Sequence, residues 1–268
     1  MQYDPIKDFL GRFFSGPAFI RKIFYFLLDL LLLRTWHVKK ALRRISSVYP
    51  GEARVLDAGC GFGQYSWRMK RMNASWHIKA VDIDKERIDD CAAFFKKAGA
   101  GDISCEVMDL EKLADTGLYN VILSVDVMEH INEDGLVFRN FHRALKSEGI
   151  LLISTPSDRG GSDVHGENEQ SFIEEHVREG YGSDEITSKL MAAGFRNVNV
   201  SYTYGTPGSI SWRLSMKYPV KMLGFSRIFF LLLPFYYLVT FPFALILNLA
   251  DVSTNHKSGT GLLVTAYK

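Results

Sequence analysis

The sequence predicts a doubly wound α/β fold, in which a largely parallel sheet is covered by helices on both faces. Two observations support this: short apolar runs rich in Val, Ile and Leu alternate with longer segments of helical periodicity, and a glycine-rich stretch directly follows the first run. Ligands of such sheets bind at the carboxyl ends of the strands, beside the first strand. We expect strands at 54–57, 78–81, 103–108, 120–124, 150–154, 195–204 and 261–267, and helices at 64–72, 85–98, 134–146 and 184–193.

The composition fits one large globular domain, or such a domain with an appendage. The chain has 268 residues, of which 47% are apolar and 23% charged, and this excludes disorder, collagen and a disulfide scaffold. The three cysteines, Cys60, Cys91 and Cys105, are odd in number and lack the spacing of a metal site. We therefore expect a reducing compartment and no bound metal.

Charge is distributed unevenly along the chain. Residues 1–50 carry a net charge of +6 and residues 205–258 a net charge of +4, whereas residues 51–204 between them carry −9. Both basic flanks are also the most apolar parts of the chain. This combination favours an anionic membrane surface as a partner and disfavours nucleic acid, because nucleic-acid binders place positive charge on a polar face without runs of Leu and Phe.

The glycine-rich stretch indicates a cofactor site. The first predicted strand ends in Val-Leu-Asp-Ala-Gly-Cys-Gly-Phe-Gly, which places Asp57 before Gly59, Gly61 and Gly63. Glycines here permit a tight turn and a close approach of the backbone to a ligand. The spacing differs from the Gly-x-Gly-x-x-Gly of dinucleotide-binding proteins, which disfavours an NAD-type dehydrogenase. The stretch resembles the first motif of the class I S-adenosylmethionine (SAM) dependent methyltransferases, where it holds the methionine end of SAM.

Three further strand ends are similar to that family. Asp82 ends the second strand, where the family's acid bonds both ribose hydroxyls, and Asp84 is the weaker candidate for this role. Asp109 and Leu110 resemble the adenine site, and residues 124–131 are similar to the Glu-Val-Leu-Glu-His-Val of ubiquinone- and menaquinone-type methyltransferases. The resemblance implies a Rossmann-like sheet of seven strands with the last strand antiparallel. It also implies cofactor contacts from Asp57, Gly59, Gly61, Gly63, Asp82, Asp109, Leu110 and Ser124.

Methyl transfer to a hydroxyl needs a base for the acceptor's proton, whereas the sulfonium leaving group is already activated. The candidates are His130, after the fourth strand, and His165 and His176 within 157–182, a segment that looks like an active-site lid. The alternatives are a role in folding for His130, and solvated or lid-packing positions for His165 and His176.

Two apolar segments lie outside the resemblance, which covers residues 50–204 and the last strand. The run 23–33 would span about 16 Å as a helix, half of a hydrocarbon core of about 30 Å. We predict that it lies in the membrane interface, with packing onto the protein's own core as the alternative. The insertion 205–260 contains 23 consecutive residues, 228–250, without Asp, Glu, Lys or Arg.

A single membrane crossing by 228–250 would separate the last strand from its sheet. We therefore predict a bent, re-entrant or surface-lying element, broken by Pro234 and Pro242. The alternative is an apolar cap over a substrate pocket, or a dimer interface, in a soluble protein. Four aromatic residues of the insertion are suited to a membrane interface, namely Trp212, Tyr218, Tyr236 and Tyr237.

These features divide the chain into an N-terminal helical region (1–50), a SAM-binding core (51–204), a hydrophobic helical insertion (205–260) and the last core strand (261–268). We expect a monotopic, SAM-dependent methyltransferase on the cytoplasmic side of the inner membrane, which O-methylates a phenol or enol of a lipophilic small molecule. The alternatives are C-methylation of a quinone, polyene or lipid precursor, a soluble cytoplasmic methyltransferase with a homodimer as one form, and a non-catalytic SAM-binding membrane protein.

Overall fold

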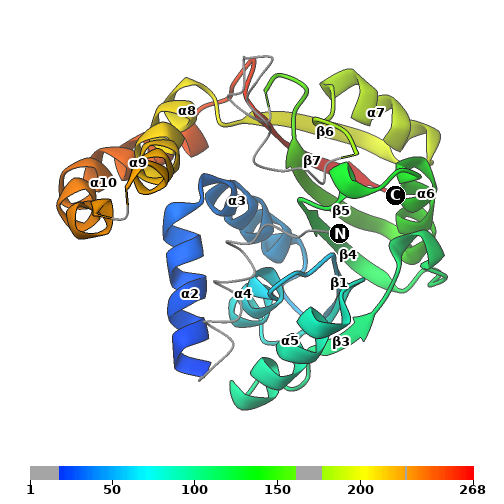
Figure 1. Ribbon diagram of the computed structural model, residues 1–268. Helices are drawn as coiled ribbons and strands as arrows, with labels where there is room; N and C mark the ends of the chain where they lie inside the picture. The colour runs from blue at the N-terminus through cyan, green and yellow to red at the C-terminus, as the bar shows by residue number, and fades with distance from the viewer. Residues whose placement is uncertain (1–17, 161–176, 227) are drawn as a thin grey trace.

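The fold is a seven-stranded sheet with helices on both faces and a helical projection on one side (Figure 1). A computed structural model describes residues 18–160, 177–226 and 228–268. The strands follow the order β3-β2-β1-β4-β5-β7-β6 across the sheet. Their bounds are β1 (Ala53–Ala58), β2 (Trp76–Asp82), β3 (Ser104–Val107), β4 (Tyr119–Val125), β5 (Leu145–Pro156), β6 (Arg196–Thr203) and β7 (Gly261–Tyr267).

The first five strands run parallel, whereas β7 is antiparallel to both β5 and β6. This confirms the predicted Rossmann-like sheet of seven strands with an antiparallel last strand. β5 begins at Leu145, ahead of the predicted start at Ile150, because Leu145 pairs with Tyr119 before a shift in register. The strand order reverses between β1 and β4, so a ligand crevice is expected where these two strands end.

Two hydrophobic clusters cover the two faces of the sheet. Val55 and Ile78 belong to the cluster with α2 to α5, while Leu56 and Val81, on the opposite face of the same two strands, belong to the cluster with α6 and α7. This division follows from the alternation of side chains along a strand. The helices are α2 (Ala18–Leu31), α3 (Leu33–Val48), α4 (Gln64–Met72), α5 (Lys85–Lys97), α6 (Asp134–Ala144) and α7 (Ser183–Ala192).

The insertion between β6 and β7 is a helical hairpin that projects from the core (Figure 1). It consists of α8 (Thr206–Trp212), the π-helical turn η3 (Arg213–Lys217), α9 (Tyr218–Phe225) and α10 (Phe229–Ser253). The Tyr236 hydroxyl of α10 donates to the carbonyl of Leu214 at 2.8 Å, and the Ser211 hydroxyl of α8 donates to the carbonyl of Ala244 at 3.0 Å. These bonds join the two arms of the hairpin.

α10 is one continuous helix of 25 residues, so the prediction that Pro234 and Pro242 break it is wrong. A proline inside a helix lacks the N–H of one helical hydrogen bond and its ring crowds the carbonyl four residues earlier, so continuity here needs support from outside the helix. The bonds of Tyr236 and Ala244 to the other arm lie on either side of Pro242 and hold both stretches in line. The Tyr237 hydroxyl bonds within the hairpin in the same way, to the carbonyl of Ser215. Trp212 and Tyr218, in contrast, are 36% and 47% exposed.

The end of α10 is fastened to the core by a buried carboxylate. Asp251 lies between His37 of α3, whose Nε2 is 2.7 Å away, and His256, whose Nε2 is 3.1 Å away. The backbone N–H of Gly208 in α8 donates to the same carboxylate at 3.0 Å. Burial alone would raise the pKa of Asp251, but the hydrogen bond from His37 and the proximity of His256 lower it. One ionised group thus joins α10, α8, α3 and the turn before β7.

Candidate active site

The loop between β1 and α4 turns sharply through three glycines. Gly59, Gly61 and Gly63 have φ angles of 79°, 52° and 75°, and the N–H of Gly59 donates to the Val81 carbonyl of β2 at 2.9 Å. A Cβ at Gly59 would lie 2.2 Å from a methyl group of Val127, whereas a Cβ at Gly61 would meet no atom within 4 Å. Packing therefore requires glycine at position 59, while Gly61 borders open space.

Two aspartates at the end of β2 have different roles. Asp82 is 9% exposed, and its carboxylate accepts hydrogen bonds from the N–H groups of Gly61 at 2.9 Å and Asp84 at 3.0 Å. Asp84 caps α5 and accepts from the N–H groups of Glu86 and Arg87. Asp82 thus lies against the glycine loop, with lone pairs left for a further donor, while Asp84 is committed to its helix.

Polar side chains lie inside the fold behind the glycine loop. Asp57 of β1 is 2% exposed and accepts a hydrogen bond from the Ser66 hydroxyl of α4 at 2.6 Å. Burial raises the pKa of Asp57 to about 6, against the smaller effect of the Ser66 bond. Ser124 of β4 is fully buried, and its hydroxyl has no partner among the described residues.

Asp109 and Leu110 follow β3. Asp109 caps the short turn η1 (Leu110–Lys112) and pairs with Lys112 at 3.0 Å. The hydrogen bond from Lys112 lowers the pKa of Asp109, which keeps this carboxylate ionised. Leu110 is 7% exposed and belongs to the core on the α6 side. The carboxylate is therefore held near the end of β3 by its own turn and by Lys112, and its contact with a cofactor stays a prediction.

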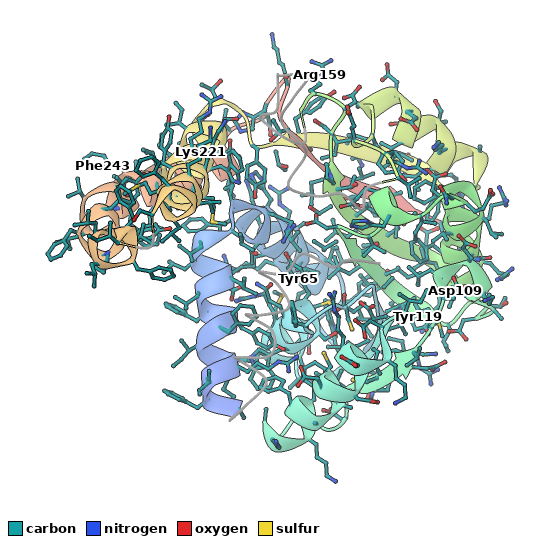
Figure 2. All side chains as sticks on the ribbon, in the orientation of Figure 1. Tyr65, Asp109, Tyr119, Arg159, Lys221 and Phe243 are labelled. Atoms are coloured by element: carbon teal, nitrogen blue, oxygen red, sulfur yellow. The ribbon has the colours of Figure 1, made fainter. Side chains whose placement is uncertain are left out.

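A second polar cluster lies at the ends of β4 and β6. Asp126 and Tyr204 directly follow these strands and have φ angles of 52° and 54°, a conformation that non-glycine residues rarely adopt. Arg34 of α3 joins them, because its guanidinium pairs with Asp126 and its backbone N–H donates to the Tyr204 hydroxyl at 3.0 Å. Tyr65 of α4 (Figure 2) is 8% exposed, and its hydroxyl has no partner in the described part of the chain.

The helix α2 covers the glycine loop. Arg21 and Tyr25 are buried, and both donate to the carbonyl oxygen of Phe62, Arg21 at a distance of 2.6 Å. One side of the apolar run 23–33 therefore packs onto the core. Its other side is exposed, with Phe26 at 62%. Packing onto the core, the alternative interpretation of this run, therefore holds for one face of α2, while contact of the other face with a membrane stays a prediction.

Of the three histidines predicted as bases, the structure describes one. His130 lies in the turn η2 (Met128–His130) after β4 and is exposed. His165 and His176 lie outside the described residues. Arg178, just after this segment, pairs with Asp134 and donates to the carbonyl of Ile131 at 2.7 Å. These contacts attach the segment after 176 to the loop that follows β4.

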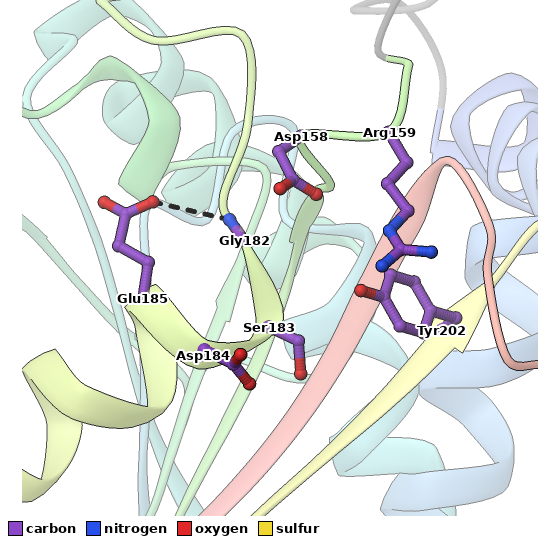
Figure 3. Close-up of a pocket in the computed structure, with 7 residues that line it drawn as sticks. All are labelled: Asp158, Arg159, Gly182, Ser183, Asp184, Glu185 and Tyr202. Carbon is purple, nitrogen blue, oxygen red and sulfur yellow. Dashed lines mark hydrogen bonds between the residues drawn. The ribbon is translucent and has the colours of Figure 1, made fainter.

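A polar cavity of about 560 Å³ lies between the end of β5 and the start of α7 (Figure 3). Arg159 stacks over the ring of Tyr202 on one side, 5.2 Å from its centre, and Glu185 accepts from the N–H of Gly182 on the other. The lining residues are Asp158, Arg159, Gly182, Ser183, Asp184, Glu185 and Tyr202, so the cavity is separate from the glycine loop.

Residues 51–194 match a protein family described as a methyltransferase domain, and this match covers more than half of the chain. The chain belongs to this methyltransferase family. It is 33% identical over 102 residues to a ubiquinone biosynthesis O-methyltransferase of Pelagibacter ubique, covering 38% of this chain and 41% of that protein. It is 26% identical over 125 residues to a malonyl-[acyl-carrier protein] O-methyltransferase of Bacillus cereus, covering 47% and 45%. The methyltransferase thus spans less than half the length of these relatives.

The fold comparison agrees with the family. The structure of phosphoethanolamine N-methyltransferase 2 from Haemonchus contortus in complex with SAM matches with a TM-score of 0.60 and 17% sequence identity. The match covers 91% of this chain and 60% of that chain. At this level of identity the likeness shows the fold alone. The fold likeness agrees with the methyltransferase domain that the family match shows over residues 51–194.

The residues at the glycine loop fit SAM. The backbone at Gly61 borders open space, and Asp82 lies 2.9 Å from its N–H with acceptor capacity to spare. A positively charged sulfonium and two ribose hydroxyls suit an open backbone cradle beside a carboxylate. When bound, SAM supplies a methyl group that is activated for displacement. The cofactor residues named from the sequence remain predictions at the level of individual contacts.

Sequence reasoning missed three residues of the site, namely Arg34, Tyr65 and Tyr204. Arg34 and Tyr204 are 170 positions apart in the chain, so no local pattern joins them. Tyr65 lies two residues after Gly63, within reach of the motif, but a tyrosine at the start of a helix gives no signal of its own. Asp126 was visible in the similarity to the family motif, whereas its backbone strain was not.

Proposed function

We propose that this methyltransferase is associated with the cytoplasmic face of the inner membrane and transfers the methyl group of SAM to a hydroxyl of a lipophilic small molecule. A phenol or enol is the favoured acceptor. Two relatives named as O-methyltransferases support transfer to oxygen. The observation that carries the membrane part is the exposure of α10.

α10 presents apolar side chains to the surroundings along its whole length. Among the parts of the chain that the structure describes, it is the one helix long and apolar enough to cross a membrane by length and composition. Both ends of the hairpin return to the same sheet, so in this proposal α10 lies in the membrane interface and does not cross the membrane. Transferring one such side chain out of water contributes ~1.5–3 kcal/mol. Those most exposed are Phe230, Leu231, Phe235, Leu238, Val239 and Ile246.

The charges on the surrounding helices suit an anionic surface. The described helices α2, α3 and α8 to α10 contain two acidic residues, Asp29 and Asp251. Asp29 pairs with Arg68, and Asp251 is buried between two histidines. Their basic residues include the exposed Lys22 and the exposed Lys221, of which Figure 2 labels Lys221. The outward charge of this side is therefore positive, as contact with anionic headgroups requires.

The acceptor would be held near the ends of β4 and β6. Asp126 is the described carboxylate at this place that can take the acceptor proton, since it is partly exposed and oriented by Arg34. In the transfer, the carbon–sulfur bond breaks as the oxygen–carbon bond forms, and the acceptor proton passes to the base. Strain at Asp126 and Tyr204 is consistent with a site that constrains its ligand.

Methyl-labelled SAM, purified protein and a total lipid extract of the producing cells test this proposal. After reaction, the label is partitioned between an organic and an aqueous phase, with Gly61→Ala as the control that leaves the hairpin intact. We expect label in the organic phase with the wild type alone, and mass spectrometry then identifies the acceptor. Label that stays in water, with SAM binding intact, contradicts a lipophilic acceptor and favours the hairpin as a cap or a dimer contact.

A further inference from the structure

The helix α2 has two opposed faces, one buried against the core and one exposed. Its buried face holds the glycine loop, and its exposed face is apolar. We propose that docking of α2 on an anionic lipid surface and binding of SAM at the glycine loop strengthen each other. This inference rests on the membrane association proposed above and names a regulation of that same site.

The buried face of α2 contacts the glycine loop at Phe62. The carbonyl oxygen of Phe62, between Gly61 and Gly63, accepts hydrogen bonds from Arg21 and Tyr25. Arg21 is anchored in turn, because it pairs with Asp90 of α5. The ring of Phe62 packs edge-on against Phe24 of α2, with 5.9 Å between ring centres. The contacts from α2 thus add to those of Val81 and Asp82, which hold the same loop from the side of β2.

A second contact joins α2 to the helix that begins at the loop. Asp29 near the end of α2 accepts a hydrogen bond from Gln64 at 2.9 Å and pairs with Arg68, both in α4. α4 starts directly after Gly63. Movement of α2 away from the core would therefore break contacts both within the loop and with the helix that follows it. The conformation that binds SAM is the one with α2 docked.

The exposed face forms a continuous apolar stripe. Phe19, Ile23, Phe26 and Leu27 are 71%, 39%, 62% and 38% exposed, and their spacing places them on one side of the helix. Lys22 lies beside the stripe and is exposed. An apolar stripe with a flanking cation is the pattern of a helix that lies in a lipid interface.

The occupant of this face is a lipid bilayer because α10 lies on the same side. In Figure 1, α2 runs along the side of the core from which α8 to α10 project. With α2 packed on the core, one bilayer can contact α2 and α10 together. Once one of the two helices has bound, the other is held next to the same bilayer, which raises its effective concentration there. With α2 detached, its orientation relative to α10 is lost, and so is this advantage. Lipid therefore binds the docked state better, which is the condition for coupling.

The test measures the dissociation constant of SAM by calorimetry, with and without vesicles of phosphatidylglycerol and phosphatidylcholine. We expect binding at least about fivefold tighter with vesicles, at the lower end of typical coupling. Phe26→Ser on α2 should abolish this gain while leaving the lipid-free constant unchanged. Phe243→Ser on α10 is the matched control, since Phe26 and Phe243 are 62% and 61% exposed. At saturating lipid, the control should keep the gain.

Reciprocity supplies a second readout. SAM should increase the affinity of the wild type for the same vesicles, measured by co-sedimentation over a range of lipid concentrations, by the same factor. Co-sedimentation with an unchanged SAM constant overturns this inference alone and leaves the membrane association in place. Failure to co-sediment, with a concentration-dependent dimer by analytical ultracentrifugation, overturns both, because a second copy of the chain then covers the apolar face.

Discussion

Replacing Gly61 by alanine should have two effects: it should weaken the binding of SAM at the glycine loop, and it should strain the backbone. A matched control variant distinguishes the two. The new Cβ meets no protein atom within 4 Å, so it occupies space that the structure leaves to a ligand. The left-handed φ of 52° adds strain of roughly 1–2 kcal/mol for any residue with a side chain. Gly117 is the matched control, because its φ is 57° and its Cβ also meets no atom within 4 Å, yet it lies before β4, outside the loop.

Both variants should therefore lose about the same stability, roughly 1 kcal/mol in chemical denaturation after the smaller entropy of the unfolded alanine chain is included. Their affinities for SAM should differ. A methyl group in the cradle displaces the ligand from backbone contacts worth about 0.5–1.5 kcal/mol each, so Gly61→Ala should weaken binding by about tenfold or more. Calorimetric titration measures this, with Gly117→Ala expected to bind as the wild type does. Equal affinities for the two variants would refute the placement of SAM at Gly61.

Three further substitutions probe the groups around the site. Burial raises the pKa of Asp57 from 3.8 to about 6, so the wild type should lose stability as the pH rises from about 4 to 6. Chemical denaturation at pH 4.5 and at pH 7 measures this loss, which should be absent from Asp57→Asn. Asp251→Asn weakens the buried hydrogen bonds to His37 and to the N–H of Gly208 and should cost about 1.5–3 kcal/mol, visible as a lower melting temperature and earlier proteolysis within α10. Asp126→Asn tolerates the left-handed backbone but loses the pair with Arg34; turnover at saturating SAM should fall by about tenfold or more, with SAM affinity nearly unchanged.

Local signals predicted the sheet and the cofactor loop, because both depend on short-range patterns. The glycines from 59 to 63 are readable from the alternation of strands and turns, whereas the roles expected for Asp82 and Asp109 came from the resemblance to the family. The acceptor side could not be read in this way, since Arg34 reaches Asp126 and Tyr204 across the fold. The continuity of α10 through Pro242 was missed for the same reason, as it depends on a partner helix that the local sequence does not show.

The position of the hairpin has a consequence for how the sheet is completed. β7 is the neighbour that joins β6 to the sheet, and the two strands are separated by residues 204–260. Before β7 arrives, β6 is an unpaired strand and α10 is an exposed apolar helix, and both favour aggregation of a partly folded chain. The hairpin brings its own ends together, since His256 bridges to Tyr202 and the N–H of Thr260 bonds to the carbonyl of Tyr204. Closure of the hairpin therefore brings β7 close to the strands with which it pairs and lowers the entropic cost of that pairing. A lipid surface beside the nascent chain would cover α10 until β7 has paired.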